Sequence, residues 1–135
     1  MNRTSLEGGC QCGAIRFSIA AGGIEAAGYC HCGICRRLSG APVTAWVATA
    51  VGAYSLGAGT PVIYRSSPDG AREFCAACGS QLLFRGSDGS ITVSTTALDT
   101  PADPAVVPTF HIHAASRLDW FEIADALPRH PAGSN

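Results

Sequence analysis

The chain has 135 residues, of which 47% are hydrophobic and 14% are charged, and its formal net charge is −1. This composition excludes a disordered chain and predicts one packed domain over residues 1–135. No basic stripe is present, so nucleic acid is not expected as a partner. Arg16 and Ser18 interrupt the apolar stretch at residues 13–20, and no longer apolar run follows. Neither a signal peptide nor a membrane span is therefore expected, and we predict a soluble, cytoplasmic protein.

The predicted elements are mostly short β-strands, marked by alternating apolar residues or by β-branched and aromatic residues. In the first of them, Ile15, Phe17 and Ile19 share one face. In chain order, the expected strands cover residues 14–19, 43–49, 62–66, 80–85, 91–95 and 110–115. The pattern predicts a mainly β fold.

Turn signals and weak helical signals lie between and after these strands. Pro68–Gly70 and Ser87–Gly89 are expected turns, and the second predicts a hairpin because strands flank it on both sides. Short helical turns are expected at residues 35–38 and 125–127, a proline-rich connector at 98–108, and a frayed tail at 128–135.

Seven cysteines are the most informative residues of the chain. They form the clusters Cys10 and Cys12; Cys30, Cys32 and Cys35; and Cys75 and Cys78. An odd number cannot all pair within one chain, and tight clusters in a chain expected to be cytoplasmic indicate metal ligands rather than disulfides. Thiolate-rich sites select zinc, and the spacings do not fit a ferredoxin-type iron–sulfur pattern. We therefore expect zinc as the cofactor.

Two cysteine pairs predict one closed, structural zinc site. Its four ligands would be Cys10, Cys12, Cys75 and Cys78, hereafter the first cysteine cluster. Gly79 follows the second pair directly and permits the tight turn of a zinc knuckle. Such a site would tie the N-terminal strand to the middle of the chain and contribute ~10 kcal/mol or more of folding free energy. The alternative is two unrelated pairs of buried free thiols.

The remaining three cysteines predict a metal site with an open position. Cys30, Cys32 and Cys35, hereafter the second cysteine cluster, offer three ligands, and catalytic zinc has three protein ligands and one exchangeable position. Cys32 and Cys35 could instead form a redox pair, although the strand–helix–strand pattern typical of such motifs is absent. A third interpretation is a cluster of thiols without metal.

Several cationic residues are candidates for a role beside this second cluster. Arg36 and Arg37 could each bind a substrate carboxylate through two parallel hydrogen bonds, could offset thiolate charge, or could face solvent. His31 lies between two ligands and is expected to face solvent. His111 and His113 are expected on one exposed strand face, where they could act as general acid or base or remain inert.

Five segments of the chain resemble the glutathione-dependent formaldehyde-activating enzyme family, which includes centromere protein V. They are "GGCQCGAIRF", "CHCGICRRLSGAP", "REFCAACGSQL", "TTALDTPAD" and "HIHAASRLDWFEIADALPRH". The resemblance extends over about residues 6–131 and implies a β-tent of several small antiparallel sheets around zinc. It also implies that the first cysteine cluster holds structural zinc and that Cys30, Cys32 and Cys35 hold catalytic zinc.

The resemblance further implies an activity. A thiol such as glutathione would join a carbonyl carbon to give an S-hydroxymethyl thiol, and the reverse reaction is carbon–sulfur cleavage by a lyase. The rival hypothesis is a non-catalytic zinc module that binds a protein partner. An enzyme predicts a pocket over the second cysteine cluster, whereas a binding module predicts no such pocket and an exposed apolar patch elsewhere.

Overall fold

The computed structural model describes residues 4–133, and these residues form mainly short strands. The strands are β1 (Leu6–Gly9), β2 (Arg16–Ile19), β3 (Ile24–Cys30), β4 (Thr44–Thr49), β5 (Tyr54–Ala58), β6 (Val62–Ser67), β7 (Gly70–Phe74), β8 (Gln81–Gly86), β9 (Ile91–Ser94) and β10 (His111–Ile112). One α-helix, α1 (Gly33–Ser39), and the 3-10 turns η1 (Thr95–Ala97), η2 (Pro104–Val106) and η3 (Ala114–Ser116) complete the described part. The prediction of a mainly β fold is confirmed.

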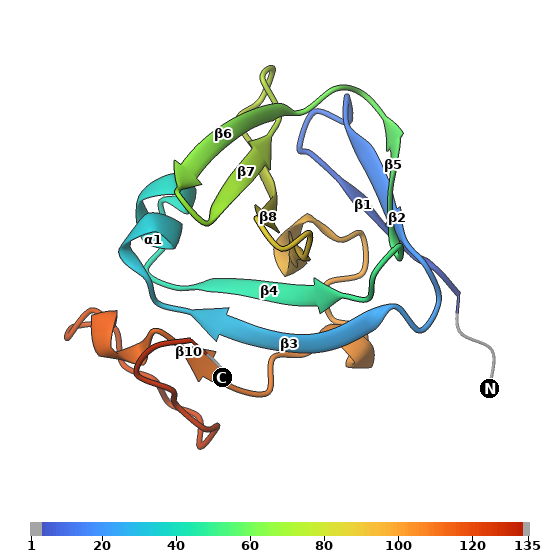
Figure 1. The fold of residues 1–135 in the computed structure, drawn as a ribbon. Coiled ribbons are helices and arrows are strands. Elements are labelled where there is room, and N and C mark those ends of the chain that lie inside the picture. Colours follow the sequence, from blue (N-terminus) through green and yellow to red (C-terminus); the bar gives the residue numbers. More distant parts are fainter. Residues whose placement is uncertain (1–3, 134–135) are drawn as a thin grey trace.

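The strands form two sheets that meet around a common interior. One sheet has three strands in the order β1-β2-β5, and the other has seven in the order β10-β3-β4-β9-β8-β7-β6. All pairs are antiparallel except that of β10 with β3. In Figure 1, β3 with β4, β6 with β7, and the three-stranded sheet lie along the sides of a triangle, with α1 at one corner.

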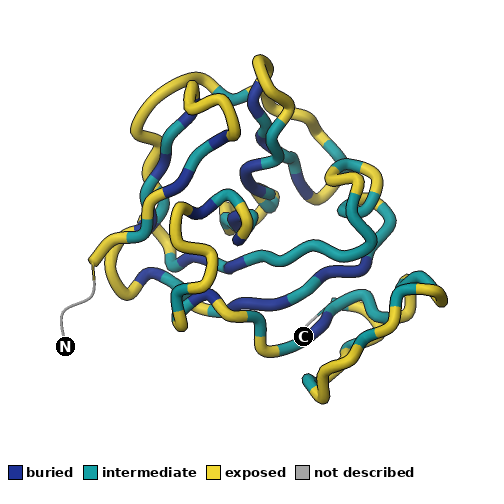
Figure 2. The backbone as a smooth tube through the Cα atoms, turned by 180° about the vertical axis from the view of Figure 1, so that it is seen from behind, coloured by how far each residue is buried: buried dark blue, intermediate teal, exposed yellow. Residues whose placement is uncertain are grey.

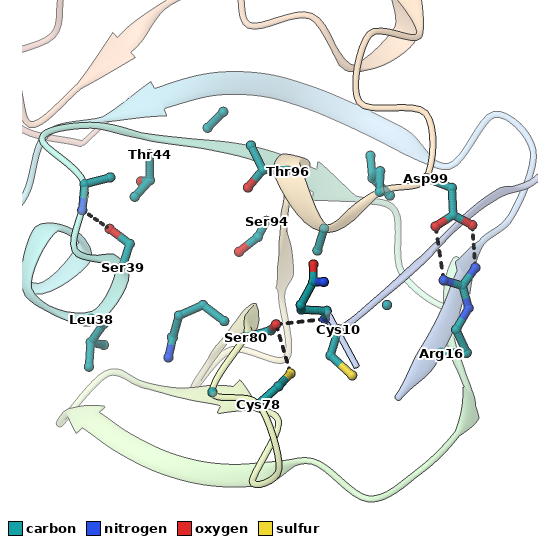
Figure 3. Close-up of a pocket in the computed structure, with 18 of the residues that line it drawn as sticks. Cys10, Arg16, Leu38, Ser39, Thr44, Cys78, Ser80, Ser94, Thr96 and Asp99 are labelled. Carbon is teal, nitrogen blue, oxygen red and sulfur yellow. Dashed lines mark hydrogen bonds and ion pairs between the residues drawn. The ribbon is translucent and has the colours of Figure 1, made fainter. Parts of the chain in front are cut away.

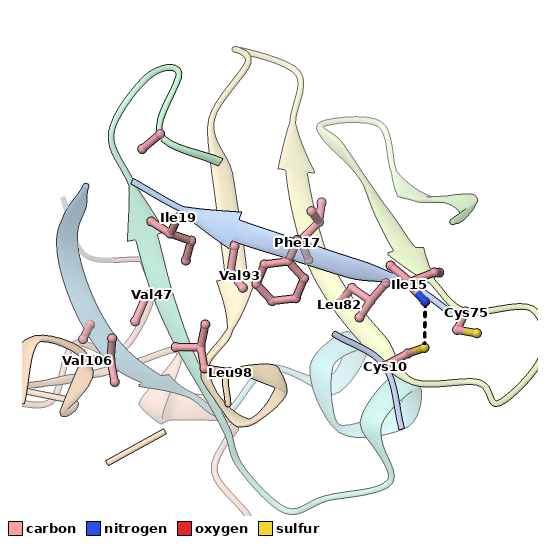
Figure 4. Packing of buried hydrophobic residues seen from close by; sticks show 13 residues of the cluster. Cys10, Ile15, Phe17, Ile19, Val47, Cys75, Leu82, Val93, Leu98 and Val106 are labelled. Atoms are coloured by element: carbon pink, nitrogen blue, oxygen red, sulfur yellow. Dashed lines mark hydrogen bonds between the residues drawn. The ribbon is translucent and has the colours of Figure 1, made fainter. Parts of the chain in front are cut away.

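The core fills the space between the two sheets. Alternation along β2 directs Phe17 and Ile19 inward, where they meet Val47 of β4 and Val93 of β9 (Figure 4). Leu82 of β8 joins the same cluster, and it is fully buried, as are Ile19, Val47 and Val93. Figure 2 shows that the buried stretches follow the inner strands, whereas the turns and most of the edge strands β5 and β6 are exposed. Side chains from both sheets therefore stabilise one core.

Local sequence signals predicted several elements correctly. The hairpin at Ser87–Gly89 joins β8 to β9, and the turn at Pro68–Gly70 joins β6 to β7. The expected helical turn at residues 35–38 is part of α1. Among residues 4–133, no helix is both long and apolar enough to cross a membrane.

Two expectations for the C-terminal region were wrong. Residues 125–127 form no helical turn, because the Asp125 carboxylate accepts a hydrogen bond from the Leu127 amide in an irregular segment. Within the expected frayed tail, the described residues 128–133 are held to the sheet: the His111 amide donates to the Pro128 carbonyl, and the His130 amide donates to the His111 carbonyl. The last part of that tail, residues 134–135, lies outside the described residues.

Candidate metal and thiol-binding site

The first cysteine cluster lies where the two sheets meet. Cys10 and Cys12 follow β1 in the three-stranded sheet, whereas Cys75 and Cys78 lie between β7 and β8 in the seven-stranded sheet. A glycine with positive φ follows each cysteine pair directly, as the tight turn of a zinc knuckle requires. These glycines are Gly13, with φ of 83°, and Gly79, with φ of 79°. The cluster therefore brings together two segments that are far apart in the chain.

The sulfur atoms of this cluster have the spacing that zinc requires. Cys12 Sγ lies 3.6 Å from Cys10 Sγ and 3.8 Å from Cys75 Sγ, and all four sulfur atoms lie within 4.8 Å of one another. Zn–S bonds of ~2.3 Å in a tetrahedron place ligand sulfurs ~3.8 Å apart. Hydrogen bonds from Ser80 and from the Cys12 amide lower the pKa of Cys78 to about 5, which favours the thiolate that binds metal. This donor set fits a structural zinc ion.

The second cysteine cluster lies at the junction of β3 and α1. Cys30 ends β3, Cys32 caps α1, and Cys35 lies in the first helical turn. The Cys32 sulfur accepts a hydrogen bond from the Cys35 amide at 3.3 Å, and the Cys35 thiol lies 3.5 Å from the Cys30 sulfur. The cap geometry thus directs three thiols toward one point, within 4.8 Å of one another.

These three thiols stabilise negative charge unevenly. Hydrogen bonds from Cys30 and Cys35 lower the pKa of Cys32, whereas the contacts of Cys30 with Cys32 and Cys35, together with burial, raise the pKa of Cys30. A divalent cation removes this competition because it favours all three thiolates at once. The donor set fits zinc with three protein ligands and one position for another group.

The second cysteine cluster forms part of the wall of a cavity of about 470 Å³, hereafter the thiol cavity. Trp46, Leu83, Phe84 and Ile112 give the cavity apolar walls, and His113 lies at its lining. None of its lining residues is acidic. A small organic ligand in this cavity would contact the cysteine sulfurs directly, as the hypothesis of an enzyme requires.

Figure 3 shows a second cavity, of about 620 Å³, hereafter the polar cavity. It reaches Cys10 and Cys78 of the first cysteine cluster, and its charged residues, Arg16 and Asp99, are already paired with each other. The two cavities share Leu38, Ser39, Thr44, Ala45, Gln81 and Ser94. These shared residues border both cavities.

Arg72 lies at the second cysteine cluster, although the sequence analysis did not predict it as a site residue. It lies on β7, 37 residues from Cys35 in sequence, and its Nη1 donates to the Cys35 sulfur at 3.5 Å. It also lines the thiol cavity. No local motif marks this arginine, because only the pairing of β7 within the sheet brings it to the second cysteine cluster.

The two predicted arginines lie outside the lining of both cavities. Arg36 Nη1 donates to the His31 carbonyl at 2.9 Å and also to the Ser116 carbonyl, which joins α1 to η3. Arg37 is exposed on α1. Their role in binding a substrate carboxylate stays a prediction.

The prediction for His31 was wrong, since this side chain is fully buried. Extended backbone at Cys30–Cys32 directs His31 to the opposite side from the two cysteine side chains, where His111 of β10 lies against it. His31 Nε2 lies 2.8 Å from His111 Nδ1, and His111 Nε2 lies 3.1 Å from both carboxylate oxygens of Asp125. Burial and the neighbouring His111 lower the pKa of His31, which favours its neutral form.

The expected shared, exposed face of His111 and His113 was also wrong. His111 is buried and its ring stacks on Tyr29, with ring centroids 4.8 Å apart. The strand ends at Ile112, and His113 adopts a left-handed conformation with φ of 53°. This break in the alternation leaves His113 half-buried at the thiol cavity.

Comparisons with known proteins show which family the chain is similar to. The model of the family "Glutathione-dependent formaldehyde-activating enzyme" matches residues 5–116, a range that contains all seven cysteines. A Halomonas elongata protein, named as a candidate glutathione-dependent formaldehyde-activating enzyme, is 31% identical over 139 aligned positions, covering 87% of this chain and 80% of that protein. A crystal structure of a Rhodobacter sphaeroides protein shares the fold, with a TM-score of 0.53 and 22% identity over 73% of this chain and 91% of that one.

Proposed function

Because the chain belongs to the glutathione-dependent formaldehyde-activating enzyme family, we propose that it joins a small thiol to an aldehyde carbon and cleaves the product in reverse. The thiol would be glutathione or a related compound, and the activity that of a carbon–sulfur lyase. The reaction is balanced without an oxidant: an S–C bond forms, and the thiol proton moves to the former carbonyl oxygen. The observation that carries this proposal is the position of the second cysteine cluster in the wall of the thiol cavity.

The residues of the chain would hold the metal, the thiol and the proton. Cys30, Cys32 and Cys35 would bind zinc, which when bound supplies a Lewis acid and favours ionisation of a substrate thiol. The apolar walls near Trp46 would exclude water and hold the two reactants together. His113, at the lining of the same cavity, would carry the proton between sulfur and oxygen.

The proposal is tested by the rate at which zinc-loaded protein interconverts formaldehyde, glutathione and their adduct, followed by NMR exchange spectroscopy. We expect the protein to accelerate the exchange and Cys35→Ser to remove the acceleration while one zinc ion remains bound per chain. His113→Ala should reduce the rate by roughly 100- to 10,000-fold, the range for loss of a general acid–base group. A wild-type rate equal to the uncatalysed one would overturn the proposal.

A second candidate function has one observation in its favour. Val62, Ile63 and Tyr64 are exposed on β6, which is an edge strand of the seven-stranded sheet, as expected of a module that binds a protein partner. The thiol cavity supports the enzyme more directly, because a binding module does not need thiols in a cavity wall. If zinc-loaded protein neither binds a thiol nor accelerates the exchange, the binding module becomes the better account.

A further inference from the structure

Arg72 is held at the second cysteine cluster by contacts on both sides. Its Nε donates to Ser66 Oγ at 3.4 Å, and its guanidinium carbon lies 5.2 Å from the centroid of the Phe84 ring. The antiparallel register explains both contacts, since Arg72 pairs with Tyr64 on β6 and with Phe84 on β8. The guanidinium is therefore fixed in place before any ligand binds.

The guanidinium still has hydrogen-bond donors to offer. Of its five N–H groups, one points to Ser66 and one to the Cys35 sulfur, so three remain. Arg72 belongs to no ion pair among the described residues, and among residues 4–133 it is the sole arginine, lysine, aspartate or glutamate that lines the thiol cavity. An unpaired, oriented arginine of this kind matches a carboxylate.

Charge balance at the cluster points the same way. Three thiolates around a divalent ion leave a net charge of about −1, which repels an anionic ligand. Arg72 offsets that charge at the sulfur of Cys35, so an anionic group can approach there. Because the guanidinium lies beside Cys35, a carboxylate that reaches it must be close to the thiol end of the ligand.

We propose that Arg72 determines substrate specificity at the second cysteine cluster by selecting small thiols that carry a carboxylate near the sulfur. This inference rests on the proposed function, because it presumes that a thiol enters the thiol cavity. It assigns the anion-binding role to a residue of β7 rather than to the arginines of α1.

The test is isothermal titration of zinc-loaded protein with 3-mercaptopropionate and with 3-mercapto-1-propanol, which lacks the charge. We expect wild type to bind the acid roughly 10-fold or more tightly than the alcohol, as one oriented Arg–carboxylate contact allows. Arg72→Gln should reduce this preference to about 2-fold or less. Arg72→Lys keeps the charge without the planar fork and should retain only part of the preference, which keeps the test decisive if Arg72→Gln does not fold.

Arg65→Gln is the matched control, because Arg65 is exposed on the adjacent strand β6 and does not line the cavity. It should leave the preference at its wild-type value. The inference is overturned if Arg72→Gln or Arg72→Lys keeps the full preference, or if only the double variant Arg36→Ala with Arg37→Ala removes it.

The same titrations with cobalt-loaded protein separate the two proposals, since a thiol that reaches the metal alters the thiolate–cobalt absorption. If neither thiol binds or alters that absorption in wild type, the proposed function fails and the inference with it; if both bind equally well, only the inference fails.

Discussion

At the scale of single residues, a hydrogen-bonded chain runs from the buried His31 through the buried His111 to the exposed Asp125, behind the second cysteine cluster. An ionised Asp125 accepts from His111 Nε2, which leaves His111 Nδ1 to accept from His31 Nε2. His31 Nδ1 has no protein partner in the described part of the chain and is then a free acceptor. The chain joins the end of β3, next to Cys30, to the C-terminal segment, and it requires that one end be negatively charged.

That requirement predicts how stability depends on pH. Partial desolvation of Asp125 opposes ionisation, but hydrogen bonds from His111 and the Leu127 amide outweigh it and lower the pKa of Asp125 below 3.8. A carboxyl with a lowered folded-state pKa stabilises the protein above its unfolded-state pKa and loses that contribution as the pH falls through the folded-state value. The part of the stability difference between wild type and Asp125→Asn that comes from this carboxylate should therefore shrink as the pH falls below about 4.

Parallel thermal unfolding of the two proteins at each pH measures this difference. Acid-labile groups remote from Asp125, including the first cysteine cluster, are the same in both proteins and contribute equally. A difference that stays constant down to pH 3 would show that the Asp125 carboxylate does not hold the histidine chain together.

At the scale of elements, composition explains which strands the sequence revealed. The strands rich in β-branched and aromatic residues were predicted close to their observed bounds, as with β4 and β9. Strands β3 and β7 were missed because "IEAAGYC" and "GAREF" contain glycine and alanine, which have low strand propensity. Each is paired on both sides, so neighbouring strands supply the order that propensity does not. Because β7 was not predicted, the sequence analysis did not identify Arg72, which lies on this strand, as a candidate site residue.

Glycine also has a specific use in β7. A Cβ atom at Gly70 would overlap the Phe84 ring and lie 3.1 Å from the Arg85 carbonyl oxygen. Gly70→Ala should therefore lower the free energy of unfolding by about 1–3 kcal/mol, because the aromatic ring must move. Gly57→Ala is the control, since its nearest contact would be an ordinary 3.5 Å on the exposed strand β5. Its unfolding free energy should be unchanged or slightly raised. Equal effects of the two substitutions in urea denaturation would contradict this account.

At the scale of the whole molecule, the cysteine spacing was sufficient to predict the partition into four and three thiols that the structure brings together. Ligand pairs are local in sequence, so spacing alone carries that information. The positions of His31, His111 and Arg72 depend on contacts between residues far apart in the chain, and no local pattern encodes them. The sequence therefore predicted the cysteine clusters but not the residues that surround them, and our proposal on ligand specificity rests on one of those residues, Arg72.

The partition also predicts two different consequences of losing a ligand. The first cysteine cluster joins the three-stranded sheet to the seven-stranded sheet, whereas the second lies within six consecutive residues, Cys30–Cys35. Cys75→Ser should release one zinc ion and unfold much of the domain, with a loss of several kcal/mol, since structural zinc supplies ~10 kcal/mol or more to folding. Cys35→Ser should cost about 1–2 kcal/mol, because β3 and α1 remain held by their other contacts. Thermal melts with zinc analysis measure both effects, and equal losses would mean that the second cysteine cluster is as structural as the first.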